Sequence, residues 1–209
     1  MRGTNIGTPE PLQRESRRCV VRSVRNGLFR LLAIAIASVL VGPSWLHAQR
    51  SSPSEYEVKA AYLYDFGKFV TWPANAATGD GFPICVLGED PFGATFDATI
   101  AGENINGKKV VVNRIAKPQE AVSCRILFIS ASEEKQLKDI LSTLDKTSVL
   151  TVSDISQFTR RGGMIQFVID ANRVRFEVNV ATAQRAGLTL SSQLLKVAIN
   201  VRRDSQTGD

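Results

Sequence analysis

The chain has 209 residues and a formal net charge of +6, but its excess charge is concentrated at one end. Residues 1–48 hold seven arginines and two glutamates, which leaves 19 basic against 18 acidic residues in the remainder. So balanced a domain offers no basic face for nucleic acid, whose binding requires several phosphates to be neutralised together. The only histidine, His47, also lies in this first segment, which excludes histidine-based nucleophilic catalysis and imidazole zinc ligands from the rest.

The first 48 residues have the three-part pattern of a secretion signal. Arginines precede an apolar run at 31–41, and Pro43 and small residues follow it. The run is shorter than the roughly 20 residues that a membrane-spanning helix needs. We predict cleavage between Ala48 and Gln49, followed by a short linker over 49–54. An uncleaved membrane anchor is the alternative, and "SRRCVVR" also resembles a twin-arginine export signal.

The remaining chain begins with a predicted amphipathic helix over 55–71, within "EYEVKAAYLYDFGKFVTWP". Ser54 and Glu57 have the spacing of a capping box, and Pro73 ends the helix. Apolar residues recur every three or four positions, while Lys59 and Lys68 are expected on the polar face. Strands are predicted at 83–88, 106–115 and 124–131, with a helix at 91–100 that has Pro91 in its first turn.

The second half of the chain continues this alternation. Ser132 is the expected cap of a helix over 133–144, whose leucine and isoleucine residues line one face. A strand at 148–154 and a short helix at 155–163 precede a β-hairpin of strands 164–170 and 173–179. Residues 180–200 are expected to be helical on both sides of a break near Gly187, and 201–209 to form a polar tail.

Apolar strands that alternate with helices indicate an α/β fold, formed by a single layered domain over 55–200. Continuous apolar strands are typical of a mainly parallel sheet flanked by helices, and the late hairpin adds antiparallel strands at one side. About 160 residues suit one such domain.

Two cysteines remain after the predicted cleavage, Cys85 and Cys124, each at or near the start of an apolar strand. In an oxidising compartment an even pair indicates a disulfide, worth roughly 4 kcal/mol on the chain-entropy model. Two buried free thiols are the alternative, since cysteine is also a good core residue.

Ligands on parallel sheets bind beyond the carboxyl ends of the strands, which here are the loops "LGEDPFG", "SASEE" and "VSDISQ". Gly88 and Gly93 lack the spacing of a dinucleotide-binding loop, so we interpret them as turn residues. Ser130, Ser132 and Ser153 have no histidine to activate them and are expected to cap helices. We therefore predict no catalytic residue, no cofactor and no metal site.

Six blocks of the sequence, in order over residues 55–199, resemble the YfiR family of periplasmic proteins: "EYEVKAAYLYDFGKFVTWP", "ICVLGEDPFG", "CRILFIS", "VLTVSD", "RGGMIQFVID" and "VRFEVNVATAQRAGLTLSSQLLKVA". The resemblance implies a homodimeric periplasmic regulator, with a central sheet flanked by helices, that represses a membrane-bound diguanylate cyclase by binding its periplasmic sensor region. It also implies an outer-membrane lipoprotein that relieves repression by sequestering the regulator. The pairing of Cys85 with Cys124 agrees with the family.

This sequence departs from the family's best-known member, which has a second disulfide near the double-glycine turn. No cysteine follows Cys124 here, so redox regulation through a second bridge is not expected. The sequence therefore supports a non-enzymatic regulator that lowers cyclic di-GMP. The alternative is a periplasmic domain that binds a small molecule in a pocket at the strand ends. Candidate contact residues on the first and last helical segments are Tyr62, Lys68, Arg185 and Gln193.

Overall fold

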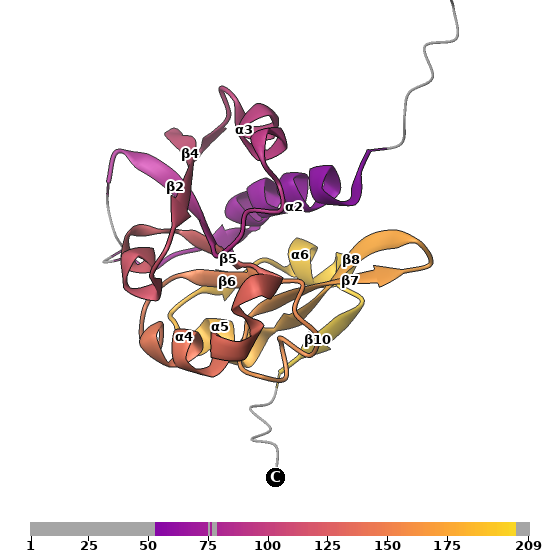
Figure 1. Cartoon of the computed structure of the whole chain (residues 1–209). Coiled ribbons are helices and arrows are strands. Elements are labelled where there is room, and N and C mark those ends of the chain that lie inside the picture. Colours follow the sequence, from indigo (N-terminus) through magenta and orange to yellow (C-terminus); the bar gives the residue numbers. More distant parts are fainter. Residues whose placement is uncertain (1–52, 75, 77–78, 204–209) are drawn as a thin grey trace, which may run out of the picture. The chain divides into compact units, whose positions relative to one another are not determined.

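The structure, a computed structural model, describes residues 53–74, 76 and 79–203 (Figure 1). The predicted signal, its cleavage between Ala48 and Gln49, and residues 204–209 of the predicted tail lie outside the described residues. The α-helices are α2 (Glu55–Phe69), α3 (Ala94–Ile100), α4 (Leu137–Thr143), α5 (Val180–Arg185) and α6 (Ser192–Val197), and the 3-10 helices are η1 (Pro118–Ser123) and η2 (Ala131–Gln136). The strands are β1 (Val70–Thr71), β2 (Gly81–Leu87), β3 (Asn104–Ile105), β4 (Lys108–Ile115), β5 (Ile126–Ile129), β6 (Leu150–Ser153), β7 (Ile165–Asp170), β8 (Arg173–Asn179), β9 (Thr189–Leu190) and β10 (Asn200–Arg202).

The main sheet has eight strands in the order β10-β8-β7-β6-β5-β2-β4-β3. Strands β4, β2, β5, β6 and β7 run parallel, whereas β8 is antiparallel to β7 and β10 is parallel to β8. The predicted α/β fold, with a mainly parallel sheet and an added antiparallel hairpin, is therefore confirmed. A separate pairing of β1 with β9 joins the end of α2 to the segment before α6.

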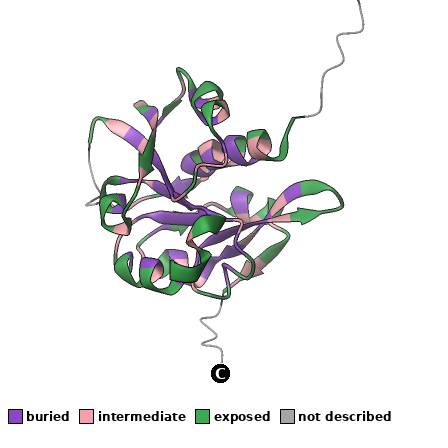
Figure 2. Cartoon of the chain, viewed as in Figure 1, coloured by how far each residue is buried: buried purple, intermediate pink, exposed green. Residues whose placement is uncertain are grey.

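Strands β5 and β6 are buried along their whole length because helices cover both faces of the sheet (Figure 2). One core lies between the sheet and helices α2 and α3, and includes Phe66, Phe96 and Phe128. The opposite core includes Leu127 of β5 and Leu137 of α4. Removal of this apolar area from water, at roughly 25 cal/mol per Å², is the main favourable contribution to folding.

Helix α2 begins with the predicted capping box, in which the Ser54 hydroxyl accepts from the Glu57 N–H at 3.3 Å and the Glu57 carboxylate accepts from the Ser54 N–H. Its buried face, with Phe66, packs against the sheet. Gly67 permits this close approach, because a Cβ there would lie 2.5 Å from Cδ1 of Ile105. The helix ends before the predicted residue 71, where the chain pairs with β9 instead.

Of the three serines that were predicted to cap helices, Ser130 does so, whereas Ser132 and Ser153 do not. Ser130, and not Ser132, caps the helical segment after β5, while Ser132 Oγ accepts from the Glu89 N–H at 3.0 Å. Ser153 caps no helix, because residues 155–163 form turns. Positive φ angles at Gln157 (57°) and Gly162 (102°) interrupt any helix there.

Other boundaries shift by a few residues. Helix α3 begins at Ala94, so Pro91 precedes the helix and is not in its first turn. The break near Gly187 is confirmed, with α5 before it and α6 after it. Strand β10 includes Val201 and Arg202, so ordered pairing with β8 continues into the segment that was predicted as tail.

A disulfide joins Cys85 of β2 to Cys124, which lies two residues before the start of β5, and the two Cα atoms are 6.0 Å apart. Strands β2 and β5 are neighbours, and both cysteines belong to the core on the α4 side of the sheet. This geometry agrees with the predicted pairing. The bridge closes a loop of sequence separation 39 between two central strands.

Replacement of both cysteines by alanine is expected to lower the free energy of unfolding by about 3–4 kcal/mol, because the unfolded chain loses its loop constraint. Urea unfolding followed by tryptophan fluorescence measures this change. The intact mass of the oxidised protein, compared with the reduced protein, reports the bridge directly. Two thiols that react with an alkylating agent in the denatured, unreduced protein would contradict the pairing.

Candidate functional site

A buried lysine, Lys59, joins helix α2 to the carboxyl end of β6. Its side chain is 3 % exposed, and its Nζ lies 2.6 Å from Oδ2 of Asp154 and 2.6 Å from Oε1 of Glu55. Asp154 directly follows β6, and Glu55 lies one turn earlier in α2. The prediction that Lys59 lies on a solvated face is therefore wrong. A buried ammonium requires such partners, because desolvation of an isolated charge is strongly unfavourable.

The neighbours of Lys59 keep it charged. Burial by itself lowers the pKa of Lys59, but hydrogen bonds to Asp154 and Glu55 outweigh burial and the pKa is raised. The ion pairs of Lys59 therefore stabilise the folded state fully at pH values below the pKa of an unfolded lysine, about 10.4. This stabilisation is lost as the pH rises through the raised pKa of Lys59 in the folded protein. The Tyr56 hydroxyl donates to Asp154 at 3.4 Å. Burial is the main cause that raises the pKa of Tyr56, and the negative charge of Asp154 raises it further.

A hollow of about 460 Å³ opens beside this cluster, and we call it the strand-end hollow. It lies beyond the carboxyl ends of β5 and β6, where the sequence predicts a binding pocket. Two carboxylates and one ammonium among its lining residues leave an excess of one negative charge. The lining residues are Glu55, Lys59, Ala131, Asp154, Ser156, Gln166, Phe167, Val168 and Ile169.

The first of the three predicted loops, "LGEDPFG", does not line this hollow. Arg114 of β4 holds it, with Nε 2.9 Å from Oδ2 of Asp90 and Nη2 2.6 Å from Oδ2 of Asp97 in α3. The hydrogen bond from Arg114 lowers the pKa of Asp97. Gly88 has φ of 88°, and a Cβ there would lie 2.4 Å from Ser132 Oγ, which agrees with its interpretation as a turn residue. These contacts are structural.

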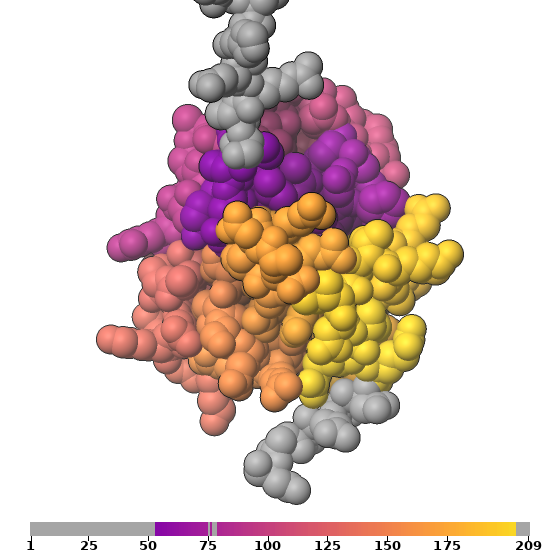
Figure 3. All heavy atoms as spheres, turned by 90° about the vertical axis from the view of Figure 1, so that its right-hand side faces the viewer, coloured from indigo at the N-terminus to yellow at the C-terminus, as the bar shows by residue number. Residues whose placement is uncertain are grey.

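A second hollow, of about 240 Å³ and mostly apolar, lies between α2 and α6, and we call it the α2–α6 groove. Figure 3 views this side of the molecule, where α2 (indigo), the β7–β8 hairpin (orange) and the C-terminal elements (yellow) adjoin. Val197 at the groove is 56 % exposed, which is unusual for a valine beside a core. The groove is lined by Tyr62, Asp65, Phe66, Phe69, Phe176, Gln193, Leu194 and Val197.

The structure brings together two of the four candidate contact residues. Tyr62 of α2 and Gln193 of α6 both line the α2–α6 groove, although they are far apart in the sequence. Lys68 instead pairs with Asp65 at 2.9 Å on the surface of α2. Arg185 lies on α5, away from the groove, at a third cavity.

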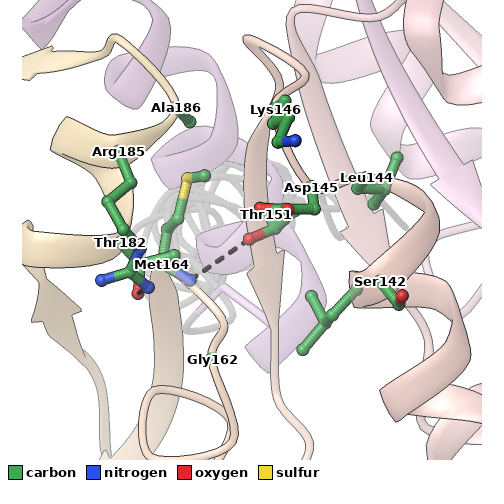
Figure 4. Close-up of a pocket in the computed structure, with 11 residues that line it drawn as sticks. Ser142, Leu144, Asp145, Lys146, Thr151, Gly162, Met164, Thr182, Arg185 and Ala186 are labelled. Carbon is green, nitrogen blue, oxygen red and sulfur yellow. Dashed lines mark hydrogen bonds between the residues drawn. The ribbon is translucent and has the colours of Figure 1, made fainter. Parts of the chain in front are cut away.

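This third cavity, of about 290 Å³, lies between α4 and α5 (Figure 4). Thr151 of β6 contributes a buried hydroxyl, which accepts from the Met164 N–H at 3.2 Å. Within the described residues, neither Lys146 nor Arg185 has a carboxylate oxygen within salt-bridge distance. The remaining lining residues are Leu141, Ser142, Leu144, Asp145, Gly162, Thr182 and Ala186.

Two structural searches concern only the part of the chain that the structure describes. None of its helices combines the length and apolar character needed to span a bilayer. Within the same residues, no three histidine, cysteine, aspartate or glutamate side chains are placed to hold a metal ion.

Asp154→Ala is expected to lower the free energy of unfolding by about 3 kcal/mol, because Lys59 stays buried and keeps only its more exposed partner. Lys59→Met removes the buried charge and leaves two carboxylates that reach solvent, so its effect should be clearly smaller. Denaturant unfolding at neutral pH compares them, with Asp65→Ala of the surface pair as the control, expected within about 0.5 kcal/mol of wild type. An Asp154→Ala variant as stable as Asp65→Ala would contradict this account.

Similar solved structures share little sequence identity with this chain. Among solved structures, a conserved domain protein from Vibrio cholerae O1 biovar El Tor is similar over 73% of this chain and 62% of its own, with 12% identity and a TM-score of 0.51. The ABC domain in complex with L-Trp from Streptococcus pneumonia has 14% identity and a TM-score of 0.46, over 70% of this chain and 60% of its own. This chain thus matches less than two thirds of the length of each, and the likeness to the Vibrio cholerae protein concerns the fold alone.

A family model also matches most of the chain. Residues 56–199 match the model of a family described as YfiR/HmsC-like. The matched range contains both cysteines, the Lys59–Asp154 pair and the β7–β8 hairpin. The chain therefore belongs to the YfiR/HmsC-like family.

Proposed function

We propose that the protein is a non-enzymatic periplasmic regulator that binds the periplasmic sensor region of an inner-membrane diguanylate cyclase and represses it. The observation that carries this proposal is the family match over residues 56–199. Repression requires the regulator to bind the inactive conformation of the cyclase more tightly than the active one. Each tenfold shift between these conformations needs about 1.4 kcal/mol of difference in binding free energy.

The proposal includes export, with removal of residues 1–48 between Ala48 and Gln49, and assembly as a homodimer. It also includes an outer-membrane lipoprotein that sequesters the regulator. The Cys85–Cys124 bridge supports an oxidising compartment, since such bridges are rare in the cytosol. The intact mass that reports the disulfide also reports the cleavage position.

The α2–α6 groove supports regulation by protein contact. Aromatic side chains dominate its lining, and aromatic residues are enriched where proteins bind one another. Val197, which lines the groove, exposes apolar surface there and is 56 % exposed. An apolar partner side chain that covered this groove would remove that surface from water.

Val197→Asp is expected to abolish repression, because it places a charge where the partner would bury apolar surface. The test deletes the gene, restores it as wild type, Val197→Asp or Val122→Asp, and measures cellular cyclic di-GMP. Deletion should raise cyclic di-GMP severalfold, and wild type should restore the low level. Val122 is a matched control, since it is 58 % exposed but lies on η1.

The result of this test separates two claims. Unchanged cyclic di-GMP after deletion, with the cyclase expressed, would contradict the proposed function. If Val197→Asp represses as well as Val122→Asp, the contact does not use the α2–α6 groove.

A second candidate function is the binding of a small periplasmic molecule, and the cavity between α4 and α5 favours it (Figure 4). Its lining contains two basic residues, Lys146 and Arg185, and one acidic residue, Asp145, so it has an excess of one positive charge. Lys146 reaches the cavity from a backbone with φ of 65°, a conformation that is uncommon outside glycine and is often found at functional sites. A mixed polar and apolar lining with one excess positive charge suits a small organic anion.

Thermal-shift screening with small carboxylates tests this candidate. A ligand at a hundred times its Kd should stabilise the fold by about 2.7 kcal/mol, which corresponds to several degrees in Tm. Arg185→Gln should remove the shift, whereas Arg160→Gln, an exposed arginine that does not line the cavity, should retain it. A shift that survives Arg185→Gln would place the ligand elsewhere.

A further inference from the structure

Strand β7 continues past the end of its parallel neighbour β6. The two strands pair only at Val152 with Ile165 and at Ser153 with Gln166. Strand β7 then runs on to Asp170 and stays paired with β8 throughout. Figure 1 shows the end of this hairpin extending beyond the rest of the sheet. The last part of β7 therefore has a neighbouring strand on one side only.

Ser153 is the reason that β6 stops. Its hydroxyl donates to the Ile129 carbonyl at 2.7 Å and accepts from the Ile155 N–H at 3.0 Å. A side chain that binds the backbone two residues later replaces the strand ladder with a local turn. The chain thus leaves the sheet at Asp154, and no strand from the described part of the chain takes its place beside the end of β7.

The hydrogen-bond pattern identifies which groups this leaves open. In an antiparallel pair, successive residues point their backbone groups alternately toward and away from the partner strand. The Met164 carbonyl accepts from the Asn179 N–H at 2.7 Å, so Phe167 and Ile169 point away from β8. Beyond the short pairing with β6, the Phe167 carbonyl and both backbone groups of Ile169 have no backbone partner among the described residues.

The open edge of β7 lines the strand-end hollow together with the acidic cluster. Phe167, Val168 and Ile169 form one side of the hollow, and Ile169 is 54 % exposed. Lys59 contacts Oε1 of Glu55 and Oδ2 of Asp154. The second oxygen of each carboxylate therefore remains available to a further donor. The hollow combines unpaired strand groups, an exposed apolar side chain and an excess of negative charge.

We propose that the strand-end hollow binds an extended peptide segment that carries a basic side chain. The segment adds to the open edge of β7 as a short strand, in the position that a longer β6 would occupy. Its backbone pairs with Phe167 and Ile169, and its arginine or lysine meets Glu55 and Asp154. Main-chain hydrogen bonds supply affinity in this mode of binding, and the side-chain contact supplies specificity.

This inference deepens the proposed function and rests on it only for the identity of the partner that supplies the segment. Docking itself is a property of the hollow and is tested without the cyclase. A small organic cation would use the two carboxylates but would leave the unpaired strand groups of β7 unused. An extended segment uses both, because consecutive backbone groups repeat at the strand spacing of about 3.3 Å per residue.

Three fluorescein-labelled heptapeptides test the proposal by fluorescence anisotropy with the purified exported protein. They share a strand-forming sequence of valine and threonine, with arginine at the centre, glutamate at the centre, or arginine at the centre with every amide N-methylated. The arginine peptide should bind at least about tenfold more tightly than the glutamate peptide. The N-methylated peptide should show no saturable binding, since it cannot complete the strand pairing.

Two variants with matched controls locate the binding. Ile169→Pro removes an N–H that β8 does not use, and proline is tolerated on such an edge, so affinity should fall at least about tenfold while the fold persists. Ile169→Val keeps the N–H and should bind like wild type. Glu55→Gln should reduce the preference for arginine over glutamate, whereas Glu89→Gln, an exposed residue outside the hollow, should not. Circular dichroism and urea midpoints verify folding of every variant.

Several results would overturn the proposal. These are no saturable binding of any peptide, equal binding of the arginine and glutamate peptides, binding of the N-methylated peptide, or wild-type affinity of Ile169→Pro. Competition by N-acetyl-arginine amide that matched the arginine peptide would assign the hollow to a small cation instead. Failure of the proposed function is separate, because it is read from cyclic di-GMP in cells and leaves these affinities unchanged.

Discussion

The contact between Lys59 and Asp154 fixes how the first helix lies against the sheet. A buried ammonium is tolerated only beside carboxylates, so α2 must place this residue at the carboxyl end of β6. With that position set, the next turns of α2 meet the sheet through Leu63 and Phe66, and Tyr62 faces α6. The strand-end hollow and the α2–α6 groove are thus both consequences of where α2 lies.

The two surfaces also share packed side chains. The Tyr62 ring at the α2–α6 groove lies 6.1 Å, centroid to centroid, from the ring of Phe167, whose backbone belongs to the open edge of β7. Phe66 stacks on the same Phe167 ring at 5.8 Å. These ring contacts could link binding at one surface to the shape of the other, because close-packed interiors have low compressibility and transmit strain.

Local patterns in the sequence predict much of the fold. The Ser54–Glu57 capping box and the alternating β7–β8 hairpin are set by residues a few positions apart, so period and spacing predict them. The burial of Lys59 depends on Asp154, 95 residues later, and no local period contains that pairing. Ser153 was likewise predicted to cap a helix. Its hydroxyl instead donates to the Ile129 carbonyl, which lies beside it only in the folded sheet, so the local sequence could not show this contact. The candidate site was therefore located to the strand ends, but its chemistry could not be read from the sequence.

The bridge between Cys85 and Cys124 bears on the order of membrane passage, oxidation and folding. It joins two neighbouring central strands, and both sulfur-bearing residues are sealed inside the core. Cytosolic thiols are kept reduced, so under the proposed export this bridge would form only after the chain has crossed the inner membrane. Passage in an unfolded state, followed by oxidation and then closure of the sheet, fits this requirement better than transport of a finished domain.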